Sequence, residues 1–192
     1  MTYFKKILEF QELLKEYNSI YRDLLSIHNK NIADNDVEHS FRVAMLCWMI
    51  IEEYKLQMDL NKVIRYALVH DLLEVYAGDI SIYADQSKKA ENEHMSFLKL
   101  KKKYPKLKSI WKHIEEYEKR EDEESKFVYV IEKIEPILVV ILSEKDHWKK
   151  RKISKEIFME KKNKKIRDIE SFAKNFSDEV LGYIEKNRKK YF

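Results

Sequence analysis

Glycine and proline are nearly missing from this chain, which has two of each among its 192 residues. An average sequence of this length carries roughly a dozen glycines and about ten prolines. Tight connections between β-strands depend on these residues, so the scarcity argues against a sandwich, a barrel or a doubly wound sheet. We therefore predict an all-α fold, and the length predicts one domain over residues 1–192.

A second cysteine and a long apolar run are also missing. Cys47 stands alone, so no internal disulfide can form, and its apolar neighbours predict a small buried side chain. The first residues mix charged with apolar side chains, unlike a secretory leader. The most apolar run, residues 43–51, is shorter than the about 20 residues that cross a bilayer. These features predict a cytoplasmic protein with no membrane partner.

Charge of neither sign dominates, because 38 basic and 34 acidic residues leave a net charge of +4. The surplus is local: residues 145–170 contain eleven Lys and Arg against five Asp and Glu. Such a segment could contact nucleic acid, but no RNA-binding signature accompanies it. We interpret it as a solvated helical face and do not expect a nucleic-acid partner.

Apolar residues recur at helical spacing along the whole chain. The pattern predicts a first helix up to Leu25, a helix capped by Asp36, and a helix capped by Asp59 that runs into His70 and Asp71. Gly78 follows, where we expect a sharp bend of the backbone. Further helices are predicted over 91–104, 107–119 and 124–144, the last kinked at Pro136, with charged closing helices over about 153–189.

Two histidines and several carboxylates are placed so that the fold could bring them together. His39 lies in the first turn of one predicted helix, and His70–Asp71 lies towards the end of the next. Antiparallel packing of these helices would put the three side chains at one point. Glu132 and Glu135 lie in an otherwise apolar segment, where an unpaired carboxylate would be costly. The pattern therefore predicts a metal site, with either glutamate as the fourth ligand.

Three runs of sequence stand in the order and spacing of the motifs of an enzyme family. The first is VEHSFRVA at 37–44, and the second is ALVHDLLEVYAGDI at 67–80. The third comprises ESKFV at 124–128 and EKIEPIL at 132–138. Together they resemble the motifs of HD-domain metal-dependent phosphohydrolases, in the version found in 5′-deoxynucleotidases. The resemblance covers about residues 34–142.

The resemblance implies a single-domain HD-type helical bundle and one divalent metal ion. By this resemblance the ligands are His39, His70, Asp71 and a carboxylate of the third motif, for which Glu132 is the candidate. Two imidazoles and two carboxylates suit Mn, Co, Fe, Ni or Zn. The implied reaction is removal of phosphate from a (deoxy)ribonucleoside 5′-monophosphate by attack of a metal-activated water.

The resemblance also implies roles for three further residues. Glu74 would position or deprotonate the attacking water, and its place four residues after His70 puts both on one side if the helix continues past His70. Asp79 would contact the sugar or the water network of the substrate. Arg42 matches an arginine of the first motif and is a candidate substrate-binding residue.

The sequence departs from the family pattern at two places. Glu132 stands where the family carries aspartate, and its extra methylene displaces the carboxylate by about an ångström or more. The family's Arg–Trp pair upstream of the first motif, which contacts phosphate and base, has no Trp here. Arg22 and His28 are the residues of that stretch that could replace it.

Two other functions remain open from the sequence. One is hydrolysis of another nucleotide, such as a guanosine tetraphosphate or a nucleoside triphosphate. The other is a catalytically weak module that senses nucleotides or binds RNA.

The many aromatic residues, the amphipathic closing helices and the habit of the family also predict a homodimer. The remaining aromatic and imidazole side chains fit no motif, and we expect surface positions for His94, His113 and His147, and core or interface positions for Trp48, Trp111 and Trp148.

Overall fold

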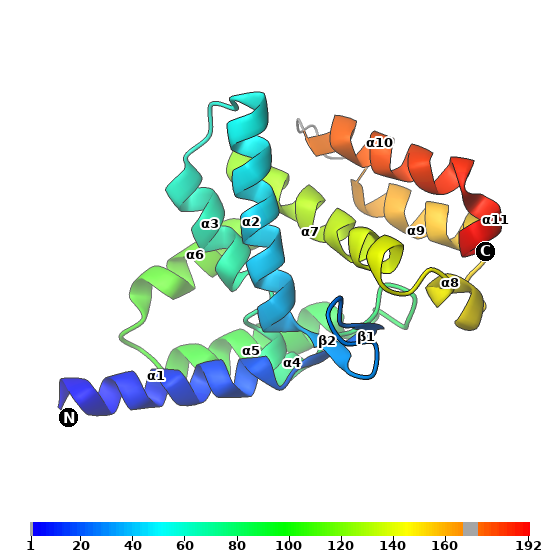
Figure 1. The fold of residues 1–192 in the computed structure, drawn as a ribbon. Coiled ribbons are helices and arrows are strands. Elements are labelled where there is room, and N and C mark those ends of the chain that lie inside the picture. The colour runs from blue at the N-terminus through cyan, green and yellow to red at the C-terminus, as the bar shows by residue number, and fades with distance from the viewer. Residues whose placement is uncertain (1, 167–172) are drawn as a thin grey trace.

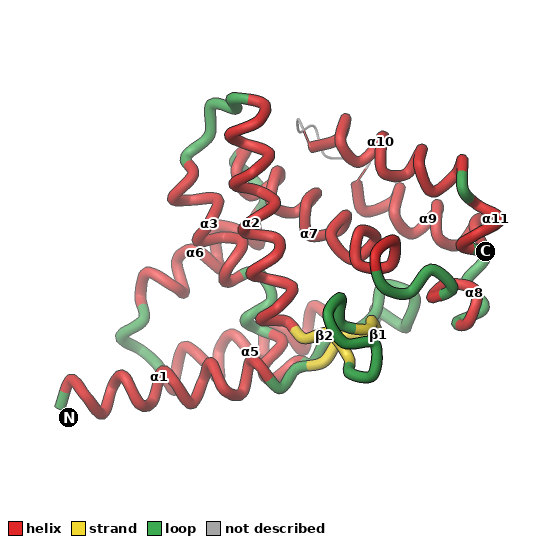
Figure 2. Tube along the Cα trace, in the orientation of Figure 1, coloured by secondary structure: helices red, strands yellow, loops and turns green. Residues whose placement is uncertain are grey.

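The computed structural model describes residues 2–166 and 173–192, and α-helices make up most of this part of the chain (Figure 1 and Figure 2). The all-α prediction is confirmed. The longer helices are α1 (Tyr3–Asn18), α2 (Asp36–Tyr54), α3 (Leu60–Val69), α5 (Lys89–Lys103), α6 (Lys108–Lys119), α7 (Glu123–Leu142), α9 (Lys155–Ile166) and α10 (Ala173–Lys186). Three single-turn helices are α4 (Glu74–Ala77), α8 (His147–Lys150) and α11 (Arg188–Tyr191).

A small antiparallel hairpin lies between α1 and α2, and it corrects the predicted first helix. Helix α1 ends at Asn18, and the chain then forms β1 (Tyr21–Leu25), which pairs with β2 (Ala33–Asn35). The apolar residues of β1 have helical spacing, but their backbone bonds go to a segment some ten residues on, which a local period does not reveal. The hairpin leads directly into α2.

Helices α2, α3 and α7 form the centre of the molecule. Figure 1 shows α2 standing between α3 and α7, and all three pairs are in contact. Their facing side chains form the main core, which includes Val43, Cys47, Val63 and Phe127, each fully buried. Helix α7 is buried along most of its length and continues through Pro136. The predicted burial of Cys47 is confirmed, and its free thiol has a pKa raised by that burial.

A second core lies between α1, α5, α6 and the turn after α3. It contains Leu13, Leu72, Leu100 and Trp111. It fixes the end of α3, which carries the second sequence motif. Within that motif the chain bends at Gly78, the C-cap of α4, whose φ of +77° confirms the expected bend.

The closing helices dock on the C-terminal half of α7, as Figure 1 shows in orange and red. Trp148 packs against Phe158, Tyr191 and Phe192, and all but Phe192 are buried. Trp111 and Trp148 are core residues as predicted. Trp48 is 47% exposed, so it is not a core residue, and its predicted place in an interface stays a prediction. In this region, Ile169, Phe172 and the side chain of Ile166 lie outside the described residues, as do the last four residues, 167–170, of the locally basic segment 145–170. Among the described residues, no helix has the length and apolar character needed to span a bilayer.

Candidate metal centre

The first imidazole of the site is fixed by the start of α2. Asn35 caps the helix, because its side chain accepts a hydrogen bond from the amide of Glu38 at 3.0 Å. The predicted cap, Asp36, is instead the first helical residue. His39 lies in this first turn and is fully buried. Its Nδ1 lies 2.6 Å from Oε2 of Glu135, so the imidazole is held in one orientation with Nε2 pointing away from α7's Glu135.

The second imidazole and a carboxylate come from the turn that follows α3. His70 is buried, and its Nδ1 donates a hydrogen bond of 2.8 Å to the carbonyl of Ala67. A carbonyl only accepts, so Nδ1 of His70 carries the proton and Nε2 has a free lone pair in the neutral ring. Asp71 Oδ2 lies 3.1 Å from Nε2 of His70 and 3.6 Å from Nε2 of His39. The antiparallel meeting of α2 and α3 therefore brings the three groups together.

Helix α7 supplies the fourth group. Glu132 Oε2 lies 3.3 Å from Nε2 of His70, and its other oxygen accepts a hydrogen bond from the Tyr117 hydroxyl at 2.9 Å. Glu135 lies on the next turn and contacts the outer nitrogen of His39 together with the guanidinium of Arg42. The structure thus distinguishes the two candidates for the fourth ligand. Glu132 faces the cluster, whereas Glu135 contacts Nδ1 of His39 on the side away from the cluster.

Ligand atoms of His39, His70, Asp71 and Glu132 all lie within 4.8 Å of one another. The Nε2 atoms of both histidines are buried and have no hydrogen-bond partner in the described part of the chain. An unpartnered buried nitrogen is costly, and here two of them face the same carboxylates. Second partners on Nδ1 are the usual way in which proteins orient imidazole ligands. The four side chains therefore fit a divalent metal ion.

The electrostatics of the cluster favour a cation. Burial and the nearby Arg22 lower the pKa of His39 to about 4, which keeps this ring neutral. Burial also opposes charge on His70, but Asp71 and Glu132 outweigh it and raise the pKa of His70 to about 9. Burial raises the pKa of Glu132, yet Lys133 and His70 together bring it down to about 2. Asp71 and Glu132 therefore favour a positive charge at this point, which a bound metal ion would supply.

A second group of acidic residues lies next to this cluster, and Arg22 forms ion pairs with two of its members. Asp36, Asp71 and Glu74 approach one another closely enough to share a cation. Nη1 of Arg22 lies 3.1 Å from Asp36 and 3.0 Å from Asp71, so an internal cation already occupies the place between them. Sequence reasoning named Arg22 for the missing Arg–Trp pair but did not find Asp36, because only the β1–β2 hairpin brings the two together. His28, the other candidate, is exposed and pairs with Ser26.

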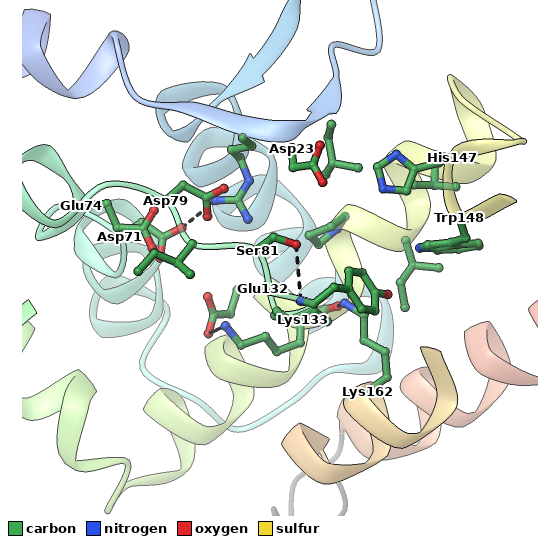
Figure 3. Close-up of a pocket in the computed structure, with 18 of the residues that line it drawn as sticks. Asp23, Asp71, Glu74, Asp79, Ser81, Glu132, Lys133, His147, Trp148 and Lys162 are labelled. Carbon is green, nitrogen blue, oxygen red and sulfur yellow. Dashed lines mark hydrogen bonds and ion pairs between the residues drawn. The ribbon is translucent and has the colours of Figure 1, made fainter. Parts of the chain in front are cut away.

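Glu74 and Asp79 line a cavity that opens beside the cluster. Figure 3 shows both on the same side of the cavity as Asp71. Glu74 is buried, and its Oε2 has no partner among the described residues, while Oε1 lies 3.3 Å from Nζ of Lys89. Burial and the adjacent Asp71 raise the pKa of Glu74 well above its ordinary value. The cavity has a volume of about 90 Å³ and opens to solvent on one side.

Arg42 is placed differently from the other predicted site residues. Its guanidinium forms ion pairs with Asp34, Glu38 and Glu135, and it is not among the residues that line the cavity. Burial opposes its charge, but Glu135 and Asp34 raise its pKa. In this structure Arg42 holds Glu135 in place behind His39. Its assignment as a substrate contact stays a prediction.

The three histidines outside the motifs differ in their exposure to solvent. His94 is exposed as predicted, and His113 is partly exposed. The surface position predicted for His147 is wrong, because it is 3% exposed and lies at the far wall of the cavity. Its Nδ1 lies 2.8 Å from Glu144, one turn earlier, which offsets the cost of burial. Spacing alone gave no signal for this pair.

A helical bundle with a buried cluster of two imidazoles and two carboxylates beside an open cavity is the architecture of a metal-dependent hydrolase. A model of the family described as HD domain matches residues 14–173. The chain belongs to this family.

Named relatives and solved structures agree with this assignment. The chain is 30% identical over 141 residues to "5′-deoxynucleotidase HDDC2" of Xenopus laevis, covering 70% of this chain and 67% of that protein. It is 28% identical to the human protein of the same name, over 70% of this chain and 66% of the other. The chain thus spans about two thirds of the length of these relatives.

The fold is shared with proteins of known structure. A "predicted metal-dependent phosphohydrolase" from Magnetospirillum magnetotacticum superposes with a TM-score of 0.78 at 20% identity, covering 96% of this chain and 94% of that one. A conserved hypothetical protein from Pyrococcus furiosus superposes with a TM-score of 0.64 at 19% identity, covering 95% and 99%. Because the likeness extends over almost the whole chain, it includes the closing helices.

Proposed function

We propose that this protein is a metal-dependent phosphohydrolase that removes phosphate from nucleoside 5′-monophosphates, with deoxynucleotides as the preferred substrates. The observation that carries the proposal is the pair of unpartnered Nε2 atoms, on His39 and His70, that face the carboxylates of Asp71 and Glu132. The HD domain family and the relatives named 5′-deoxynucleotidase support the choice of reaction and substrate.

His39, His70, Asp71 and Glu132 would hold one divalent ion at this point. When bound, such an ion polarises a phosphoryl oxygen and lowers the pKa of a water molecule. A mixed set of nitrogen and oxygen ligands suits Mn, Co, Fe, Ni or Zn better than Mg. Glu132 would take the place of the aspartate of the family, and its other oxygen is held by Tyr117 and Lys133.

Glu74 is the residue best placed to move a proton. Hydrolysis of a phosphomonoester requires a proton to leave the attacking water and another to reach the departing oxygen. The free Oε2 of Glu74 is buried in the cavity wall, and burial beside Asp71 raises the pKa of this carboxyl group well above its ordinary value, which makes it a stronger proton acceptor. Lys89, paired with Oε1, fixes the orientation of this carboxyl group.

Three cations lie beside the acidic residues at which the scissile phosphate would bind. Arg22 is paired with Asp71, Lys89 with Glu74 and Lys133 with Glu132, and all three line the cavity. They would balance the charge of a phosphate group that enters next to these acids. Asp79, whose pKa is raised by burial, lies on the same wall and would contact the sugar or its water network.

A phosphate-release screen tests the proposal directly. The purified protein is assayed with ribo- and deoxyribonucleoside monophosphates and each divalent metal in turn, alongside His70→Ala and the exposed control His94→Ala. We expect turnover with the wild type and with His94→Ala, and none with His70→Ala, while circular dichroism stays helical for all three. Full activity of His70→Ala would contradict the proposed metal centre. Lack of phosphate release from every nucleotide would contradict the proposed reaction.

A further inference from the structure

Lys162 differs from the other cations that line the cavity because it forms no ion pair with a carboxylate of the described residues. Its side chain comes from α9 and is only 5% exposed. Its Nζ donates one hydrogen bond of 2.7 Å, to the backbone carbonyl of Lys133, and it forms no ion pair within residues 2–166 and 173–192 as described. Arg22, Lys89 and Lys133 each have a carboxylate of the site as partner.

A buried ammonium group with one neutral partner is unfavourable. It has three N–H donors and here uses one of them, and burying a charge without a counter-charge is costly. Burial, with Lys133 and Arg22 nearby, accordingly lowers the pKa of Lys162 to about 7. Lys162 lines the cavity, so its other donors are available to a ligand there.

A second buried donor lines the same cavity. The Tyr83 hydroxyl is shielded from solvent and has no hydrogen-bond acceptor in the part of the chain that the structure describes. Figure 3 shows Lys162 across the cavity from Asp71 and Glu74, beyond Lys133 and on the side of Trp148. The cavity therefore has an acidic end at the metal cluster and an end with unfilled donors.

We propose that Lys162 and Tyr83 form a second phosphate-binding position, separate from the metal cluster, which takes a phosphate group of the substrate other than the one that is hydrolysed. This inference rests on the proposed function for the identity of the first position. It extends the proposed substrates from the monophosphates to nucleotides that carry a second phosphate group. A 3′,5′-bisphosphate and a 5′-diphosphate share this chemistry and differ in where the second group lies.

Binding of inorganic phosphate tests the position without any turnover. The full chain is titrated with phosphate by calorimetry, as purified and again in EDTA, for the wild type, Lys162→Met and Tyr83→Phe. Lys161→Met is the matched control, since it removes the same charge one residue away on α9 and does not line the cavity. We expect a phosphate site that survives EDTA in the wild type and in Lys161→Met. Lys162→Met should weaken this site about tenfold or more, and Tyr83→Phe less, because a charged hydrogen bond is the stronger of the two.

Substrate comparison identifies the source of the second phosphate. The catalytic efficiency kcat/KM is measured for adenosine 5′-monophosphate, 5′-diphosphate and 3′,5′-bisphosphate with the same variants. We expect Lys162→Met to reduce kcat/KM about tenfold for one of the two substrates with a second phosphate and to leave the monophosphate within about twofold.

Three results would overturn the inference: no EDTA-resistant phosphate binding by the wild type, binding that Lys162→Met and Tyr83→Phe leave unchanged, or an equal loss of kcat/KM for mono- and diphosphorylated substrates. Failure of the proposed function is distinct, because the calorimetric result does not depend on hydrolysis. Since Tyr83→Phe removes a single hydroxyl, it keeps the test decisive if Lys162→Met fails to fold.

Discussion

Glu132 and Glu135 lie one helical turn apart on α7, yet they have different partners. Glu132 faces the unpartnered nitrogen of His70, whereas Glu135 binds the outer nitrogen of His39. We predict that Glu132→Ala loses bound metal almost entirely, because a charged ligand is removed. Glu135→Ala should retain metal with affinity lowered about 10- to 100-fold, because only the support of His39 is lost.

Metal content by elemental analysis at matched folding checks this prediction, with Glu132→Asp as an intermediate variant that should weaken binding. Loss of metal in Glu135→Ala together with retention in Glu132→Ala would contradict the assignment. Retention in both would mean that α7 contributes no ligand.

Lys162 gives the protein a measurable pH dependence of stability. An unfolded lysine titrates near pH 10.4, whereas burial, Lys133 and Arg22 bring the folded pKa of Lys162 down to about 7. Between these pH values the unfolded chain binds more protons than the folded chain, so the free energy of unfolding rises with pH. The contribution of Lys162 to stability is therefore complete above about pH 10 and is lost as the pH falls towards 7.

We expect the wild type to gain about 2 kcal/mol or more of stability relative to Lys162→Met between about pH 7 and 9.5. Urea unfolding at several pH values measures this difference, and Lys161→Met serves as the control. If the free energy of unfolding of the wild type and of Lys162→Met changes with pH in the same way, burial does not lower the pKa of Lys162.

At the residue level, the sequence pointed to four side chains that the structure places together, and it revealed less of their surroundings. His39, His70, Asp71 and Glu132 have the spacing of the motifs, and the structure brings them together. Asp36 and Lys162 were missed, because a carboxylate and a lysine in charged stretches have no local signal. Their roles depend on the hairpin and on the docking of α9, which are contacts between distant segments.

Gly78 matters at the scale of the element it ends. Its φ of 77° and ψ of 151° lie in a region that side chains with a Cβ avoid, and no atom lies within 4 Å of the position where a Cβ would stand. The cost of Gly78→Ala is therefore backbone strain and not crowding, about 1–3 kcal/mol. The strain would also displace Asp79 in the cavity wall.

Gly182→Ala on α10 is the matched control for this prediction. It has the same empty surroundings in a helical backbone, where alanine should stabilise by about 1 kcal/mol or less. Denaturant unfolding of both variants gives the comparison. Equal stability of Gly78→Ala and Gly182→Ala would show that the turn relaxes without strain.

Element boundaries were predictable where a cap or a strong helical period marks them. The capping residue Asp59 is confirmed, with its side chain accepting from the amides of Asn61 and Lys62. Helices α5, α6 and α7 begin and end within about three residues of the predicted limits. The β1–β2 hairpin was missed, since pairing of two strands follows from tertiary context and not from the period of either segment.

At the scale of the whole molecule, α2 presents an apolar side to solvent. Phe41, Met45, Trp48 and Met49 are each about half exposed and are spaced along one side of the helix. Together with the homodimer predicted from the sequence, this surface is where we expect a second copy to pack. Sedimentation at micromolar concentration should give a species of about twice the 23.4 kDa chain mass.

Trp48→Glu should shift this species to the monomer, while Leu98→Glu, which changes an exposed leucine on α5, should not. A single species at the chain mass for the wild type would refute the prediction of a dimer.

The metal cluster draws its members from three segments that are distant along the chain: the start of α2, the turn after α3 and the middle of α7. An ion bound there acts as a cross-link that exists only when the chain is folded. The folded population would then follow the supply of free metal, with about 2.7 kcal/mol of added stability at a concentration 100 times the dissociation constant. Thermal unfolding with added metal or EDTA should shift the midpoint in opposite directions in the wild type and leave it fixed in His70→Ala. Metal scarcity would therefore lower the amount of this protein as well as its activity.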